Sequence, residues 1–202
     1  VDAGPSGCRA CAIDAAGQLV ASARSPLPPS RRPAPGHAEQ HPDDWWRALG
    51  TTLQQLIAGL PTGTRARALA IDGTSGTLLL CDERGTPLSQ GLMYDDRRGQ
   101  HTAATIAAHA PPDSAARGGG SALARLLWLN AERPPGRRPG HALHQAEWLT
   151  ARLLGEVGLG DENNCLKLGY DPRTGRWPAW LAELGVPLAQ LPRVGPSGRP
   201  LG

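Results

Sequence analysis

The sequence predicts a mixed α/β fold that begins with antiparallel strands and continues mainly as helices. Up to Tyr94, short apolar runs alternate with turns rich in Gly and Asp, and one long helical period interrupts them. After Asp96, apolar residues recur mostly at helical spacing. This order of elements differs from the strict strand–helix alternation of a doubly wound parallel sheet.

The N-terminal segment predicts a three-stranded antiparallel meander. Residues 8–14 form one expected strand, Ala16-Gly17 supplies a turn, and residues 19–23 form the returning strand. Val1-Asp2 opens the meander, and a Gly-rich turn over residues 4–7 connects it to the second strand.

A long amphipathic helix follows this meander. Residues 26–35 are too rich in proline for a helix or a central strand, so we expect a loop there. Pro42 suits the first turn of a helix, and Asp43 and Asp44 suit the positive end of its dipole. Apolar residues then continue at helical spacing: Trp45, Trp46, Leu49, Leu53, Leu56 and Leu60.

Three further strands and several helices complete the prediction. We expect a short buried strand over residues 67–71, ending at Asp72, then a loop and strands over 77–81 and 88–94. The expected helices cover 98–109, 121–132 with Ser121 as its cap, 144–154 ended by Gly155, and 178–184. Residues 1–110 are therefore expected to form a mixed sheet core and residues 121–202 a mostly helical part.

Composition excludes several classes of protein. The longest apolar run of the 202 residues is far short of the roughly 18–20 that a membrane span needs, so we expect no membrane partner. The net charge is only +3, and the Arg residues are scattered rather than striped, which argues against nucleic-acid binding. The basic residues are almost all Arg, with Lys167 as the single lysine, a skew typical of a GC-rich coding sequence.

The cysteines favour a reducing compartment. Cys8 and Cys11 have the C-x-x-C spacing of half a zinc site, but the sequence has no second pair at similar spacing. Both also lie in an expected strand, where residues three apart point to opposite faces. We therefore expect buried thiols. No targeting peptide is visible before Val1, so we expect that one was removed or that the chain is a fragment. We expect a cytoplasmic protein, with a plastid as the alternative because the N-terminus is incomplete.

Two strand ends carry a carboxylate beside a Gly- and hydroxyl-containing turn. Asp2 precedes the turn over residues 4–7, and Asp72 precedes the turn over residues 73–76. Free N–H groups in such turns bind anionic oxygens, and the carboxylate can hold a metal or its waters. The alternative is a pair of ordinary Asp-Gly turns. Neither is a Walker loop, because no Gly-Lys-Ser/Thr follows.

A second candidate site lies at residues 93–98, Met-Tyr-Asp-Asp-Arg-Arg. It places two carboxylates and two guanidiniums at an expected junction between a strand and a helix. Polyols need acceptors and donors arranged in this way. The alternative is a capped helix start whose charges are solvated.

Seven segments carry recognisable motifs in order: Asp2-x-Gly-x-Ser-Gly and residues 8–14, 35–46, 70–77, 93–97, 163–171 and 177–181. Together they resemble the FGGY family of carbohydrate kinases, in particular its D-ribulose kinase and plant xylulose-kinase-like branch. The resemblance spans nearly the whole chain.

The resemblance implies an actin-like, ribonuclease-H-like fold of two domains, with residues 1–202 as an incomplete N-terminal sugar-binding domain. ATP with Mg²⁺ would bind mainly to a C-terminal domain beyond Gly202. The general-base Asp of the family would lie there too, since no residue of 1–202 matches its motif. We therefore expect residues 1–202 alone to lack kinase turnover.

The resemblance also implies roles for single residues. Asp2 would lie near the Mg²⁺–phosphate group, acting on the metal through its waters, and Ser6 and Gly7 would belong to the first phosphate hairpin. Ser75, Asp95 and Arg97 would lie near the sugar hydroxyls. The family usually has Thr where this chain has Pro5, and proline lacks both the hydroxyl and the N–H.

The leading functional hypothesis is ATP-dependent phosphorylation of a ketopentose, D-ribulose or D-xylulose, by the full-length parent. The expected partners are thus a small sugar and ATP; the oligomeric state is left open. The alternative is a non-catalytic sugar-binding or regulatory half-domain, which Pro5 and the missing base favour. A zinc or nucleic-acid module, based on Cys8, Cys11 and the Arg content, is the third hypothesis.

Overall fold

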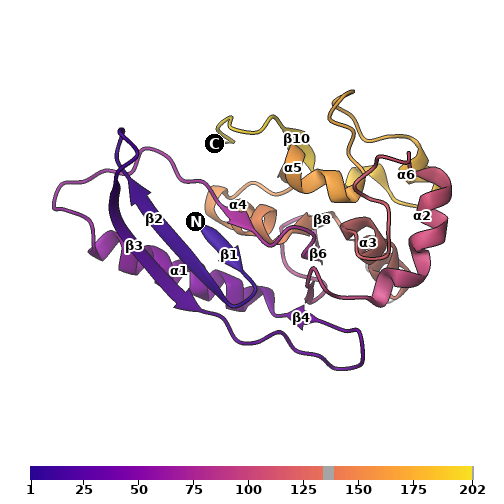
Figure 1. Cartoon of the computed structure of the whole chain (residues 1–202), viewed down its shortest axis with the longest axis horizontal. Coiled ribbons are helices and arrows are strands. Elements are labelled where there is room, and N and C mark those ends of the chain that lie inside the picture. The colour runs from indigo at the N-terminus through magenta and orange to yellow at the C-terminus, as the bar shows by residue number, and fades with distance from the viewer. Residues whose placement is uncertain (134–138, 202) are drawn as a thin grey trace.

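The computed structural model describes residues 1–133 and 139–201 of an elongated α/β molecule. The N-terminal strands and helix α1 (Pro42–Ala58) occupy one end (Figure 1). Helices α2 (Ala103–His109) and α3 (Ala122–Ala131) occupy the other end.

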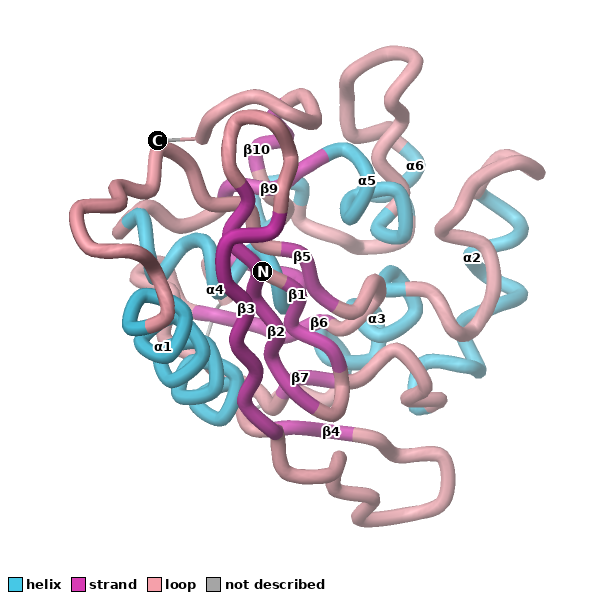
Figure 2. Tube along the Cα trace, turned by 60° about the vertical axis from the view of Figure 1, so that its left-hand side comes forward, coloured by secondary structure: helices cyan, strands magenta, loops and turns pink. Residues whose placement is uncertain are grey.

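The first sheet has the strand order β3-β2-β1-β5, and Figure 2 shows its strands side by side. The strands are β1 (Asp2–Gly4), β2 (Gly7–Ile13), β3 (Leu19–Pro26) and β5 (Asp72–Gly73). β2 pairs antiparallel with both β1 and β3, which confirms the predicted meander. β5 adds a parallel strand to β1, with Asp2 opposite Asp72.

The strand expected over residues 67–71 is wrong: β5 contains only Asp72 and Gly73, and residues 61–70 are exposed. In the structure this segment joins the first strand only at its end, where Asp72 N donates to Val1 O at 2.7 Å and the Val1 amino group donates to Ala70 O at 2.8 Å.

The second sheet, with the order β4-β7-β6-β8, is antiparallel and lies between the two ends. Its strands are β4 (Glu39–Gln40), β6 (Leu78–Cys81), β7 (Gly91–Leu92) and β8 (His141–His144). The expected strand 88–94 is thus shorter than predicted. Its ladder is interrupted because the Leu80 N–H donates to the Ser89 hydroxyl, at 2.9 Å, instead of a backbone carbonyl.

Strand β6 explains why the sequence contains a continuous apolar run there. Leu78 and Leu80 pack into one buried cluster with α3, whereas Leu79 and Cys81 pack into a second cluster with α1. A strand covered on both faces needs apolar side chains at every position. The second sheet therefore separates two hydrophobic cores, one at each end of the molecule.

The long helices begin and end largely where the sequence predicts. α1 begins at Pro42, α3 is capped by the Ser121 hydroxyl, and α4 (Gln145–Leu154) ends at Gly155 with φ +74°. The stretch 98–109 is a 3₁₀ turn (Arg98–Thr102) followed by α2.

The C-terminal part also contains short elements. These are a parallel pair of strands, β9 (Leu159–Asp161) and β10 (Arg193–Gly195), helices α5 (Glu162–Cys165) and α6 (Trp180–Glu183), and 3₁₀ turns Leu166–Leu168 and Leu188–Gln190. The sequence analysis predicts neither β8 nor the β9–β10 pair. Pairs this short depend on their neighbours for stability more than on their own pattern.

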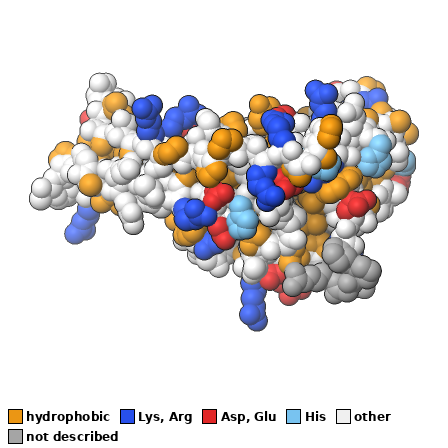
Figure 3. Space-filling model, turned by 90° about the horizontal axis from the view of Figure 1, so that it is seen from below, with side chains coloured by type: hydrophobic (Ala, Val, Ile, Leu, Met, Phe, Trp, Pro, Cys, Tyr) orange, Lys and Arg blue, Asp and Glu red, His pale blue; other side chains and the backbone are white. Residues whose placement is uncertain are grey.

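The surface and the cysteines agree with the sequence pattern. Cys8 is buried and Cys11 exposed, so the two point to opposite faces of β2 as predicted. The expectation of buried thiols is confirmed for Cys8, Cys81 and Cys165 but is wrong for Cys11, whose position on the other face of β2 leaves it exposed. On the face that Figure 3 shows, basic and acidic side chains are interspersed among apolar ones. No helix within residues 1–133 and 139–201 is long and apolar enough to cross a membrane.

Candidate active site

A row of charged residues crosses one face of the first sheet. Arg24, Arg9, Asp2 and Asp72 are register partners on β3, β2, β1 and β5, and register partners project to the same face. Arg9 Nη2 donates to Asp2 Oδ2 at 2.5 Å, and both side chains are about half exposed or more, at 67% and 49%. The pairing of β1 with β5 thus brings together the two carboxylates that the sequence singles out.

This pair of carboxylates fits a hydrated Mg²⁺. Magnesium keeps several waters and binds through one or two carboxylates plus phosphate oxygens. Within the described ranges, no group of three or more His, Cys, Asp or Glu side chains gathers into an all-protein metal site. Asp2 Oδ2 already accepts a hydrogen bond from Arg9 and Asp72 Oδ1 accepts one from Gly73 N, so among the described contacts one oxygen of each carboxylate is left for such an ion.

The connection between β1 and β2 is a two-residue hairpin tip, Pro5-Ser6, anchored through its carbonyls. Gln40 Nε2 donates to Pro5 O at 2.8 Å, and Leu27 N donates to Ser6 O at 3.0 Å. Buried Gln40 is oriented in turn by Trp45, whose Nε1 donates to Gln40 Oε1 at 2.8 Å. Because both carbonyls accept hydrogen bonds from other residues of the protein, the backbone of the tip is held in place.

The donors of the tip point to solvent. The Ser6 N–H and hydroxyl have no hydrogen-bond partner among residues 1–133 and 139–201, and Ser6 is exposed. Gly7 serves close packing, because a Cβ there would lie 2.7 Å from Ser25 O. Of the two residues that the resemblance assigns to phosphate, Ser6 thus presents open donors, and Gly7 allows β3 to approach.

The loop after β5 carries Ser75 and lies against the first strand. Thr74 N donates to Ala3 O at 3.3 Å, which fixes the loop to β1. The Ser75 hydroxyl makes no hydrogen bond to any described residue, and Ser75 is half-buried. Lys167 Nζ reaches Ser75 O at 3.5 Å, the outer limit of a hydrogen bond. The Lys167 ammonium, from the 3₁₀ turn Leu166–Leu168, therefore contacts the backbone of the residue that carries the Ser75 hydroxyl.

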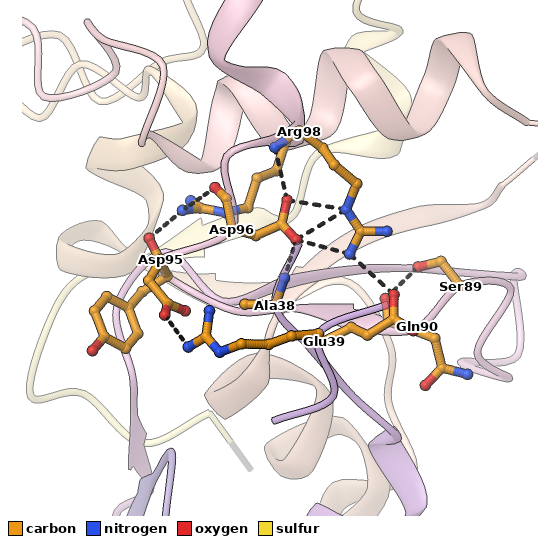
Figure 4. Close-up of polar contacts among 10 residues, drawn as sticks. Ala38, Glu39, Ser89, Gln90, Asp95, Asp96 and Arg98 are labelled. Carbon is orange, nitrogen blue, oxygen red and sulfur yellow. Dashed lines mark hydrogen bonds and ion pairs between the residues drawn. The ribbon is translucent and has the colours of Figure 1, made fainter. Parts of the chain in front are cut away.

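The segment 93–98 separates its charges into an inner and an outer pair. Asp96 is buried and accepts hydrogen bonds from Ala38 N at 2.7 Å and from Arg98 Nε at 2.9 Å (Figure 4). Arg98 also donates to Glu39 Oε2 at 3.0 Å and covers the Trp128 ring. Burial opposes the charge of Arg98, but Asp96 and Glu39 outweigh it and raise the pKa of Arg98. This inner pair stabilises the fold.

The outer pair faces away from that cluster. Asp95 Oδ2 accepts a hydrogen bond from Arg32 Nη2 at 2.6 Å, and its side chain is 33% exposed (Figure 4). Arg97 is exposed, while its N–H donates to Gly36 O at 2.8 Å. Asp95 and Arg97 are the two members of this segment that the resemblance assigns to the sugar, and both are free of the buried network.

Sequence reasoning missed three residues that shape this region: Gln40, Arg125 and Lys167. Arg125 interrupts the apolar stretch of α3, and its buried guanidinium contacts the loops of Ser75 and of Asp95. A charged residue among leucines and a single lysine among many arginines were the available signals. Gln40 lies within a quoted motif but carries no signal of its own.

Comparison with known proteins gives a consistent set of matches. The model of the FGGY family of carbohydrate kinases, N-terminal domain, matches residues 1–202. A glycerol kinase of Paracidovorax citrulli is 30% identical over all of this chain and 43% of its own length. A xylulose kinase of Streptomyces coelicolor is 28% identical, over 96% of this chain and 41% of its own.

Solved structures of related kinases also share the fold of this chain. The xylulose kinase from Rhodospirillum rubrum superposes with a TM-score of 0.87 at 25% identity, over 100% of this chain and 44% of that one. A xyloylose kinase from Brucella ovis gives a TM-score of 0.85 at 26% identity, over 96% and 41%. The chain therefore has the predicted actin-like N-terminal fold and spans less than half the length of these relatives.

Proposed function

The chain belongs to the FGGY family of carbohydrate kinases, and from this premise we propose that the intact protein phosphorylates a ketopentose, D-ribulose or D-xylulose, with Mg-ATP. Residues 1–202 would be its sugar-binding N-terminal domain. The proposal rests chiefly on one observation: β1 pairs with β5 so that Asp2, which we assign to the phosphate side, lies beside Asp72, three residues before Ser75.

We assign phosphate binding to residues on one side of the β1–β5 pairing and sugar binding to residues on the other. Ser6 would donate its N–H and hydroxyl to phosphate oxygens, as open backbone donors in turns do. Asp2 and Asp72 would hold the waters of a Mg²⁺ ion, which when bound neutralises charge on the transferring phosphoryl group. Positioning and charge neutralisation carry most of the catalysis in phosphoryl transfer.

The sugar side would consist of Ser75, Asp95 and Arg97. A hydroxyl, a carboxylate and a guanidinium together both donate to and accept from the hydroxyls of a polyol. One hydroxyl configuration distinguishes D-ribulose from D-xylulose, and a single hydrogen bond can decide between such substrates. The xylulose kinase among the relatives supports a ketopentose.

Glycerol is the second candidate substrate. It is favoured by the glycerol kinase that is 30% identical over the whole chain. Glycerol is a shorter polyol, so it would engage fewer of the proposed sugar contacts than a ketopentose. Substrate comparison therefore distinguishes the two proposals.

The test is ADP release by the intact protein with Mg-ATP and each of D-ribulose, D-xylulose and glycerol. We expect turnover to be fastest with one of the two ketopentoses. Turnover with glycerol alone would assign the second candidate. Binding of sugar without ADP release would instead favour the non-catalytic alternative.

A further inference from the structure

Arg125 is a fully buried cation whose guanidinium is surrounded by backbone carbonyls. The residue lies in α3 with 0% of its surface exposed. Nη1 donates to the carbonyls of Gly76, Gly120 and Ser121 at 3.0–3.1 Å. Nη2 donates to Asp96 O at 3.2 Å and to Tyr94 O.

The acceptors come from three segments that are distant in sequence. Gly120 and Ser121 form the start of α3 itself. Gly76 directly follows Ser75, and Tyr94 and Asp96 are the two neighbours of Asp95. Arg125 therefore bonds the backbone beside Ser75 and Asp95, two of the three side chains that we assign to the sugar.

The chemistry of the guanidinium suits this task. Its planar fork presents donors in fixed directions, whereas an ammonium is a compact point charge. Burial lowers the pKa of Arg125, and the nearby Asp96 and Asp95 carboxylates offset this only in part, so the carbonyl contacts are needed to hold the buried cation. Gly76 helps, because its φ of +88° is a conformation that other residues rarely adopt.

We propose that Arg125 is a positioning residue that fixes the separation of the Ser75 loop and the Asp95 loop by bonding the carbonyls of Gly76, Tyr94 and Asp96. Its effect on sugar binding rests on the proposed function; its hold on the two loops does not. Arg125 touches no reacting atom and acts through Ser75 and Asp95.

Amide hydrogen exchange of the intact protein tests the hold directly. The variants are Arg125→Met, which removes the donors, Arg125→Lys, which keeps the charge, and Leu129→Ala as a control. Leu129 is also buried on α3 but packs in the apolar core. We expect at least about tenfold faster exchange in peptides covering 73–77 and 94–98 of Arg125→Met, with Arg125→Lys intermediate. Equal exchange in these peptides for Arg125→Met and Leu129→Ala would overturn the proposal.

Kinetics tests the consequence. With the ketopentose and Mg-ATP varied separately, we expect Arg125→Met to raise the sugar KM at least about tenfold while the ATP KM stays unchanged. Leu129→Ala should leave both constants near wild type. An unchanged sugar KM in Arg125→Met would contradict the positioning role. If the wild type phosphorylates no polyol, the proposed function fails, and the exchange data alone decide whether Arg125 holds the loops.

Discussion

The hairpin tip and the Asp95–Arg98 segment contrast in how they are held. The tip, Pro5-Ser6, is anchored by neutral groups through its carbonyls, and the Ser6 donors face solvent. The second segment is held by buried charge, with Asp96 and Arg98 paired at 2.8 Å. Either neutral or charged groups can therefore hold a loop in place. The side chains that remain available for a ligand differ: hydrogen-bond donors at the tip and charged groups at the Asp95–Arg98 segment.

Asp96→Asn is the largest expected effect and tests whether buried charge holds the second segment. It leaves Arg98 with Glu39 as its remaining carboxylate. Removing one partner of a buried ion pair costs about 3–5 kcal/mol of unfolding free energy. The matched control is Asp95→Asn, since the pair with Arg32 is solvent-exposed and screened and should contribute little to stability. Chemical denaturation of both variants checks this, and equal losses would remove the distinction between the buried Asp96–Arg98 pair and the exposed Asp95–Arg32 pair.

Asp2→Asn tests the phosphate side. We expect kcat of the intact protein to fall by about 10²-fold or more, because a charge that supports the Mg²⁺–phosphate group is lost. Stability should change by less than about 1 kcal/mol, since the Asp2–Arg9 pair is exposed. Asp43→Asn, an exposed carboxylate at the start of α1, is the control and should leave kcat unchanged. Unaltered turnover in Asp2→Asn would contradict the role of Asp2.

Ser75→Ala and Asp95→Asn test the sugar side by equilibrium binding. Loss of one hydrogen bond should weaken sugar affinity by roughly 3- to 100-fold, the charged Asp95 giving the larger effect. Thermal unfolding should be nearly unchanged in both variants. Wild-type affinity in both, or a collapse of the unfolding transition, would show that these residues serve the fold instead.

Pro5→Thr tests the hairpin tip by adding hydrogen-bond donors instead of removing them. The new N–H and hydroxyl would join the Ser6 donors, while the carbonyl at position 5 would still reach Gln40. We expect about a tenfold higher kcat/KM for ATP and an unchanged sugar KM. If the variant is no faster, Ser6 alone provides the needed donors.

The elements with their own pattern were predictable from sequence. The run Leu78–Cys81 and the helical spacing from Trp45 to Leu56 each specify an element locally. The strand at 67–71 was not, because only Asp72 and Gly73 pair with β1 and residues 61–70 are left exposed. Arg125 shows the same limit in the site: its loop acceptors lie 29 to 49 residues away along the chain. Only the folded backbone brings those carbonyls together.

The division between a phosphate side and a sugar side is tested most directly by steady-state kinetics of the intact wild type, Asp2→Asn and Ser75→Ala. Sugar and Mg-ATP are varied independently for each protein. The account predicts that Ser75→Ala raises the sugar KM with the ATP KM unchanged, and that Asp2→Asn lowers kcat with the sugar KM unchanged. A raised ATP KM in Ser75→Ala, or a raised sugar KM at full kcat in Asp2→Asn, would contradict it.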